Sequence, residues 1–209
     1  MKRGLIIAGV GIPGIGKSTI FKELSKIING SILYSEPEEK NWPALIMNKD
    51  RIDKFSYITA FRNLRIQNYF DASEKRDSGS LVLIDSYFDK IAKFLLGKPG
   101  MEWLTPDSVY YKAIIEMAYA DFVSLPEPDA FVFLNAEFSI WESLITKRNR
   151  QIDMQRNLKG TYSMQNQIYK ALQNFRTPIV SYKLIHDKAG SNAAKIFEKL
   201  KTTLNDLGD

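Results

Sequence analysis

The sequence lacks cysteine altogether and contains a single histidine, His186, among its 209 residues. Without cysteine the chain can form neither a disulfide bond nor a thiolate metal site. One histidine is also too few for a histidine-rich metal site. The absence of cysteine agrees with a cytoplasmic location, which is the location we expect.

Long apolar runs and dense basic stripes are missing as well. The longest apolar runs are too short to span a bilayer, and the first residues fit a strand rather than a signal peptide, so no membrane partner is expected. The net charge is +5. The only basic cluster, Lys147-Arg148-Asn149-Arg150, is short. We therefore expect no nucleic-acid partner, and the positive charge fits either solubility or an anionic ligand.

Short apolar runs alternate with helical patterns along the whole chain. Strands are predicted at 5–10, 31–34, 81–84, 130–134 and 179–185. Helices are predicted at 18–28, about 52–73, 87–96, 108–125, 139–148, 162–175 and 192–207. This alternation is typical of an α/β fold with a five-stranded parallel sheet and helices on both faces. Residues 1–209 fit one domain, since no repeat or low-complexity linker divides them.

A glycine-rich turn connects the first predicted strand to the first predicted helix. Gly11 and Gly16 stand five positions apart and Lys17-Ser18 follow, which matches the phosphate-binding pattern G-x-x-x-x-G-K-[ST]. Glycines let backbone N–H groups point inward at the positive end of the helix dipole, where they bind anions. Lys17 suits the β- and γ-phosphates of ATP, and the Ser18 hydroxyl suits Mg²⁺. The predicted ATP site comprises Gly11, Ile12, Pro13, Gly14, Ile15, Gly16, Lys17, Ser18 and Thr19.

Charged residues follow several strands at the edge of the sheet that carries this turn. Glu36 follows the second strand, Asp85 ends the third, and Arg148, Arg150 and Asp153 follow the fourth strand and its helix. Ligands of parallel sheets bind beyond the carboxyl ends of the strands, so these side chains should surround one cleft. A carboxylate there can accept the proton of an attacking hydroxyl, and Asp85 can hold Mg²⁺. The structural alternatives are a charged surface loop for Glu36, a helix N-cap for Asp85 and a solvated helix end for the arginines.

These landmarks resemble the deoxynucleoside kinase and thymidylate kinase superfamily, and the deoxynucleoside kinase branch most. They are the phosphate loop, an "EP" followed by a tryptophan, an "F-x-Y…R-x-Q" helix, an acidic residue ending strand three, and an arginine-rich segment. They occur in order over most of the chain. The resemblance implies a three-layer P-loop kinase fold with a lid at about 147–161. It also implies transfer of the ATP γ-phosphoryl group to the 5′-hydroxyl of a deoxynucleoside.

The resemblance implies a role for several side chains. It makes Glu36 the base that takes the hydroxyl proton, and Trp42 a wall of the substrate pocket. Arg65 should lie near the substrate and Asp153 near the sugar 3′-hydroxyl. Arg148 and Arg150 would stabilise the transferred group from the lid, together with Lys17, and Asp85 would serve both substrate and metal.

Two positions depart from the family pattern. Serine occupies position 86, where both branches carry an arginine that contacts the phosphoryl group. Ser56 occupies the place of a glutamine that reads the base, so the choice of base stays open. The cations that can replace the missing arginine are Arg62, Arg65, Lys90 and Lys93.

Two other functions are compatible with these residues. A nucleoside monophosphate kinase would use Arg62 and Arg65 for the acceptor phosphate and would depend less on a base. A nucleotide-binding module without kinase activity would explain the serines at 56 and 86. The predicted helix at 108–125 carries aromatic residues that fit a core and a dimer face, so a homodimer is also expected.

Overall fold

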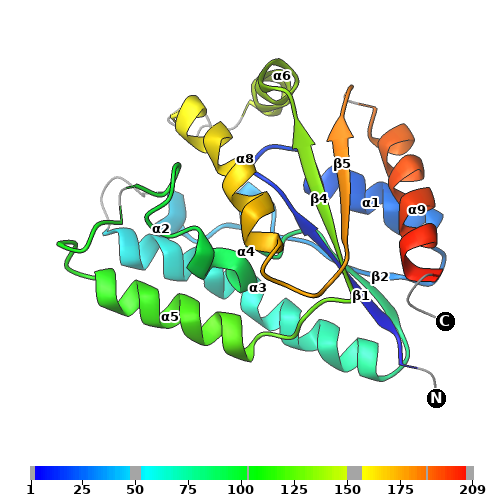
Figure 1. Ribbon diagram of the computed structural model, residues 1–209, viewed down its shortest axis with the longest axis horizontal. Coiled ribbons are helices and arrows are strands. Elements are labelled where there is room, and N and C mark those ends of the chain that lie inside the picture. The colour runs from blue at the N-terminus through cyan, green and yellow to red at the C-terminus, as the bar shows by residue number, and fades with distance from the viewer. Residues whose placement is uncertain (1–2, 48–52, 103, 150–156, 187, 206–209) are drawn as a thin grey trace.

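The sheet contains five parallel strands in the order β2-β3-β1-β4-β5 (Figure 1). The computed structural model describes residues 3–47, 53–102, 104–149, 157–186 and 188–205. The strands are β1 (Leu5–Val10), β2 (Ile32–Tyr34), β3 (Leu81–Ile84), β4 (Ala130–Ala136) and β5 (Ile179–Leu184). β1 pairs with β3 on one side, from Leu5 opposite Leu81, and with β4 on the other, from Ile7 opposite Ala130. The predicted α/β fold with a five-stranded parallel sheet is confirmed.

Helices cover both faces of this sheet. In Figure 1, α1 (Lys17–Ile27) and α9 (Ala189–Asn205) lie together on one side, and the other long helices lie opposite. The opposite layer contains α3 (Lys54–Asp77), α5 (Tyr111–Ser124) and α8 (Leu158–Leu172). The shorter elements are η1 (Glu39–Asn41), α2 (Ala44–Met47), α4 (Phe88–Ile91), η3 (Ala92–Phe94) and α6 (Phe138–Arg148). The central strands are therefore buried on both faces, which explains their nearly continuous apolar sequences.

Several helix ends differ from the prediction, and local contacts explain them. α3 begins at Lys54 because the Asp53 side chain accepts a hydrogen bond from the Ser56 N–H. α8 begins at Leu158, four residues earlier than predicted, because Asn157 caps it through the Gly160 N–H. The helix predicted at 87–96 is instead the four-residue α4 followed by η3. No helix in the described parts of the chain combines the length and the apolar sequence needed to cross a membrane.

Candidate active site

The glycine-rich turn forms a loop between β1 and α1. Gly16 is the N-cap of α1, and its φ of 88° is a left-handed conformation that favours glycine. A Cβ atom at Gly16 would meet no heavy atom within 4 Å, so the space above this residue is open. Gly14 is also left-handed, with φ of 80°, but a Cβ there would lie 2.1 Å from Cδ1 of Ile145. The loop is thus open at Gly16, at the helix N-terminus, and tightly packed two residues earlier at Gly14.

Side chains hold the loop from below and from α6. Ile12 and Ile15 are fully buried, so their side chains anchor the loop in the core. The indole N–H of Trp141 in α6 donates a hydrogen bond to the carbonyl of Pro13 at 2.8 Å. The Lys17 ammonium donates to the carbonyls of Gly11 and Ile12 at 3.0 and 3.3 Å. The Lys17 side chain therefore folds back over the loop with which it is predicted to bind phosphates.

Glu36 lies next to this loop. Its backbone N–H donates to Oδ1 of Asp85 at 3.1 Å, which joins the end of β2 to the end of β3. Burial alone would raise the pKa of the Glu36 carboxyl, but the charges of Arg65 and Lys17 and hydrogen bonds from Ser86 and Arg65 outweigh it. The pKa of Glu36 is therefore lowered, and Glu36 is an ionised carboxylate at neutral pH.

Asp85 has the environment of a candidate metal ligand. Its side chain is buried, and Oδ2 has no hydrogen-bond partner among the described residues. Burial raises the pKa of this carboxyl, although the nearby Ser18 hydroxyl works in the opposite direction. A buried carboxylate oxygen without a partner beside a serine hydroxyl matches the hard oxygen ligands that Mg²⁺ prefers. The N-cap alternative for Asp85 does not hold, because the N-cap of α4 is Tyr87.

Arg65 connects α3 to Glu36 and to a residue that the sequence did not single out. Its Nη1 atom donates to Oε1 of Glu36 at 3.0 Å. Its Nε and Nη2 atoms donate to Oδ2 and Oδ1 of Asp89 at 2.7 and 2.9 Å. The hydroxyl of Tyr69 donates to the same Asp89 Oδ2 at 2.8 Å. The only sequence signal for this cluster is that Arg65 and Tyr69 lie four residues apart on one helix face.

The other cations proposed to replace the arginine missing at position 86 point elsewhere. The Lys90 ammonium donates to the carbonyls of Phe122 and Leu125 at the end of α5, so its expected contact with the phosphoryl site is wrong. The Lys93 ammonium lies 3.3 Å from the centre of the Phe122 ring. Arg62 makes two 2.6 Å hydrogen bonds with Asp121. Arg65 alone of these four contacts Glu36, and the nearby Ser86 side chain helps to lower the pKa of that carboxyl.

The two predicted substrate residues Trp42 and Ser56 occupy different surroundings. The Trp42 indole donates to the carbonyl of Pro37, and its ring packs edge-on against Phe61 of α3 at 5.0 Å. Trp42 is thus held close to the segment that carries Glu36. The Ser56 hydroxyl donates to Oδ2 of Asp53 at 2.7 Å as part of the cap of α3. Nine residues separate it from Arg65, or roughly 13 Å along the helix.

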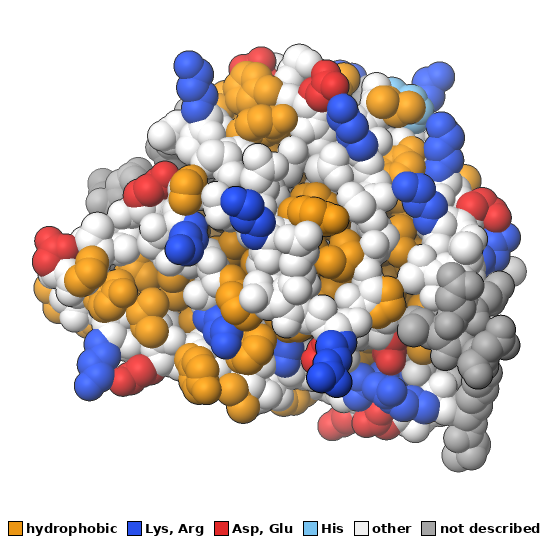
Figure 2. Space-filling model, in the orientation of Figure 1, with side chains coloured by type: hydrophobic (Ala, Val, Ile, Leu, Met, Phe, Trp, Pro, Cys, Tyr) orange, Lys and Arg blue, Asp and Glu red, His pale blue; other side chains and the backbone are white. Residues whose placement is uncertain are grey.

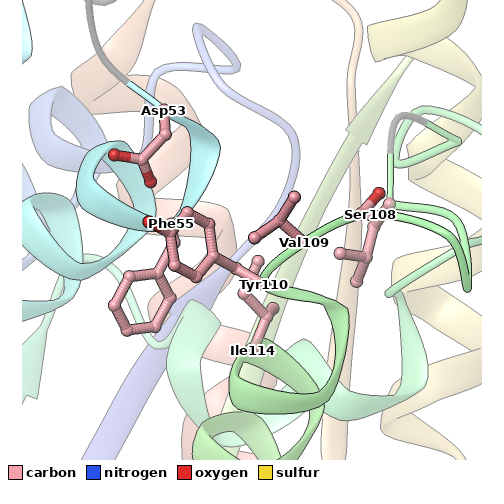
Figure 3. A pocket seen from close by; sticks show the side chains of 7 residues that line it. Asp53, Phe55, Ser108, Val109, Tyr110 and Ile114 are labelled. Atoms are coloured by element: carbon pink, nitrogen blue, oxygen red, sulfur yellow. The ribbon is translucent and has the colours of Figure 1, made fainter.

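A small apolar cavity lies beyond the cap of α3. It measures about 220 Å³ and is lined by the start of α3, the segment that precedes α5 and the first turn of α5 (Figure 3). The rings of Phe55 and Tyr110 stack beside it with their centres 5.2 Å apart. None of its lining residues belongs to the group around Lys17 and Glu36.

The predicted lid is described only at its two ends. Arg148 is the last residue of α6 and lies on the same side of this helix as Trp141 and Ile145, the two residues that pack on the loop. Arg150 and Asp153 lie outside the described residues. The structure thus brings Lys17, Ser18, Glu36, Arg65 and Asp85 together, with Arg148 on the loop-facing side of α6.

Comparisons with known proteins give fold relatives only. No protein-family model and no curated protein sequence matches the chain. Deoxyadenosine kinase from M. mycoides, solved with the products dCMP and dCDP, superimposes with a TM-score of 0.67 at 18% identity, over 95% of this chain and 100% of that one. The same kinase with bound dATP superimposes with a TM-score of 0.69 at 18% identity, over 94% of this chain and 99% of that one. Thymidylate kinase from Candida albicans superimposes with a TM-score of 0.65 at 19% identity, over 97% of this chain and 93% of that one.

The chain has the fold of these kinases. The resemblance predicted from the sequence is therefore confirmed at the level of the fold. In this P-loop kinase fold, the loop after β1 and the residues that end β2 and β3 form one group.

Proposed function

We propose that the protein transfers the γ-phosphoryl group of ATP to the 5′-hydroxyl of a nucleoside, with deoxynucleosides as the expected class. The observation that carries this proposal is the ionised Glu36, hydrogen-bonded by Arg65 and close to Lys17 of the phosphate loop. A carboxylate in this position can accept a proton from a hydroxyl that attacks a bound phosphate.

Each residue of the group has a part in this reaction. The loop backbone and Lys17 bind the phosphates of ATP. Glu36 takes the proton of the 5′-hydroxyl while the hydroxyl oxygen bonds to the γ-phosphorus and the bond to ADP breaks. Ser18 and Asp85 are suited to hold Mg²⁺, which supplies positive charge to the phosphates when it is bound. Arg148 and Arg150 would neutralise the charge that develops on the transferred group, Trp42 would wall the acceptor pocket, and Asp153 would bind the sugar 3′-hydroxyl.

The charges around Glu36 favour a neutral acceptor over a monophosphate. Arg62 and Arg65 are the residues that a monophosphate kinase would need for the acceptor phosphate, and each is engaged with a buried aspartate. An acceptor phosphate would have to break one of these pairs and approach the negative Glu36. A nucleoside hydroxyl would instead donate a hydrogen bond to Glu36 without breaking a pair.

The test is incubation of the protein with Mg·ATP and a panel of nucleosides and nucleoside monophosphates, followed by measurement of ADP. We expect turnover with nucleosides only. Turnover with monophosphates only would support the thymidylate-like alternative. ATP binding without any turnover across the panel would support a non-catalytic nucleotide-binding module.

A homodimer and a cytoplasmic location remain predictions. Figure 2 shows hydrophobic side chains gathered over α5, and Tyr119 and Val123 of this helix are more than half exposed. An exposed apolar face of this kind is compatible with a dimer contact. Light scattering at several protein concentrations would measure the oligomeric state.

A further inference from the structure

We propose that Asp89, supported by Tyr69, is a positioning residue that holds the Arg65 guanidinium in the orientation in which it contacts Glu36. The inference rests on the proposed function, because it concerns the residue that acts as the base there. It adds two residues: Asp89, which bonds Arg65, and Tyr69, which bonds Asp89.

The first step is the geometry of the pair between Arg65 and Asp89. The two carboxylate oxygens of Asp89 accept from two different nitrogens of the guanidinium, at 2.7 and 2.9 Å. The guanidinium is planar, so two parallel hydrogen bonds fix both its position and the direction of its plane. The third nitrogen, Nη1, is then directed at Glu36, 3.0 Å away. With only one of these bonds, the plane could rotate and Nη1 would lose that direction.

The second step is burial. Arg65 is 8% exposed, Asp89 4% and Tyr69 not at all. Water therefore has little access with which to replace a lost hydrogen bond, and the pair is not the weak kind of ion pair found on protein surfaces. A buried bidentate pair of this type is suited to fixing geometry.

The third step is the place of Tyr69. Its hydroxyl lies 2.8 Å from Oδ2 of Asp89 and 3.1 Å from the backbone carbonyl of Ser86. The Ser86 side chain is, after Arg65 and Lys17, another group that lowers the pKa of Glu36. Tyr69 thus connects Asp89, the partner of Arg65, to the backbone of the segment after β3 that carries Ser86. Asp89 itself comes from α4, which has only four residues and no side-chain cap, so its position depends on such tertiary contacts.

The experiment compares Asp89→Asn with a matched control, Asp121→Asn. Asp121 of α5 makes the same kind of bidentate pair with Arg62, which lies on α3 as Arg65 does. This second pair does not include Glu36. Asparagine keeps the size of aspartate but places an N–H₂ group against one of the guanidinium donors. We expect Asp89→Asn to lower kcat by about 10- to 100-fold through misplacement of the base. The KM for ATP should stay within about twofold of the wild type, since this variant leaves the phosphate loop intact. Asp121→Asn should leave kcat nearly unchanged, even if it lowers the melting temperature as much as Asp89→Asn does.

Arg65→Lys separates charge from orientation. Lysine keeps the positive charge but cannot bond Asp89 side-on and Glu36 at the same time. If orientation matters, Arg65→Lys should lose kcat to a similar extent as Asp89→Asn. The double variant with both Arg65→Lys and Asp89→Asn should then be about as slow as either single variant, because both changes remove the oriented contact between residue 65 and Glu36.

Nuclear magnetic resonance gives a second measurement that does not depend on turnover, namely the side-chain ¹⁵Nε–H signal of Arg65. This signal is assigned by its disappearance in Arg65→Lys. Because this N–H donates to Asp89, its hydrogen exchange should be slow in the wild type. The exchange should become fast in Asp89→Asn and stay slow in Asp121→Asn. Tyr69→Phe should give an intermediate exchange rate and a smaller loss of kcat.

Two failures can be told apart. If the wild type turns over nucleosides but Asp89→Asn keeps its kcat, or Arg65→Lys retains full activity, the positioning role is wrong and the proposed function stands. Slow exchange of the Arg65 signal in Asp89→Asn would also overturn the positioning role. If the wild type turns over no nucleoside, the proposed function fails first, and the inference fails with it.

Discussion

The carboxylate of Glu36 and the guanidinium of Arg65 form an ion pair with 3.0 Å between Oε1 and Nη1. The pair joins the loop after β2 to the middle of α3 and lies next to the phosphate loop. It keeps Glu36 ionised although the side chain is only 33% exposed. The first two of the following predictions depend on this relationship.

The first prediction concerns pH. Glu36 must be deprotonated to accept a proton, and its pKa is lowered, so the wild-type rate should hold down to below the ordinary glutamate pKa of about 4.3. In Arg65→Gln the opposing effect of burial should dominate, and the acid limb of kcat/KM should move to higher pH. Arg65→Lys keeps the charge, so its acid limb should stay nearer that of the wild type. The measurement is kcat/KM against pH, with circular dichroism to verify that the protein is folded. An unmoved acid limb in Arg65→Gln would contradict the assignment of that limb to Glu36.

The second prediction is that Glu36→Gln lowers kcat far more than it raises the nucleoside KM. Glutamine keeps the size of the side chain but cannot accept the proton at neutral pH. General-base catalysis contributes about 10²–10⁴-fold, so kcat should fall on that scale when chemistry limits turnover. Glu38→Gln is the control, since Glu38 lies on the same loop but is exposed and pairs with Lys40. A nearly unchanged kcat in Glu36→Gln would favour the monophosphate kinase.

The third prediction is that Lys17→Ala abolishes ATP binding or turnover while the protein still unfolds cooperatively. Lys17 is the loop cation, and its ammonium hydrogen-bonds backbone carbonyls of that loop. Lys22→Ala, an exposed position on the same helix, should bind ATP normally. Calorimetric titration with ATP measures the binding, and a thermal melt measures the cooperativity of unfolding. Wild-type ATP affinity in Lys17→Ala would remove the basis for the ATP site.

The fourth prediction concerns the candidate metal ligands. Asp85→Asn should raise the Mg²⁺ concentration needed for half-maximal turnover, and Ser18→Ala should act in the same direction. The stability of Asp85→Asn should not fall at neutral pH, because burial disfavours the Asp85 charge and asparagine still accepts from the Glu36 N–H. Turnover measured across a Mg²⁺ series and chemical unfolding provide the two readouts. The same Mg²⁺ requirement in all three proteins would exclude Asp85 and Ser18 as ligands.

The fifth prediction separates two glycines of the phosphate loop. Gly14→Ala and Gly16→Ala both force a side chain into the left-handed region, at a cost of about 1–2 kcal/mol each. Only Gly14→Ala also drives a Cβ into Ile145, and such overpacking costs a further ~1–3 kcal/mol. Gly14→Ala should therefore lower the free energy of unfolding more than Gly16→Ala does, and Ile145→Ala should reduce the difference. Urea unfolding without ATP measures these values. Equal losses in the two glycine variants would mean that the Ile145 contact is relieved without cost.

The sequence by itself determined the order of strands and helices along the chain and the glycine-rich turn before α1. Apolar runs predicted β1 and β3 with their observed bounds, and the glycine spacing predicted the turn before α1. These features depend on residues within a few positions of one another, so local periodicity and motif spacing reveal them. Helix ends were less predictable, since single side chains such as Asp53 and Asn157 set them.

Only the tertiary structure decided which buried charges pair. Arg65 and Asp89 lie 24 residues apart and Arg62 and Asp121 lie 59 apart, and no local pattern relates them. Lys90 shows the same limit: the sequence made it a candidate to replace the arginine missing at position 86, yet its ammonium bonds the end of α5. A buried charge binds whichever opposite charge or carbonyl reaches it when the helices pack, because leaving it unpaired is too costly. The packing of α3 and α4, rather than the spacing of residues along the chain, therefore placed Arg65 between Glu36 and Asp89.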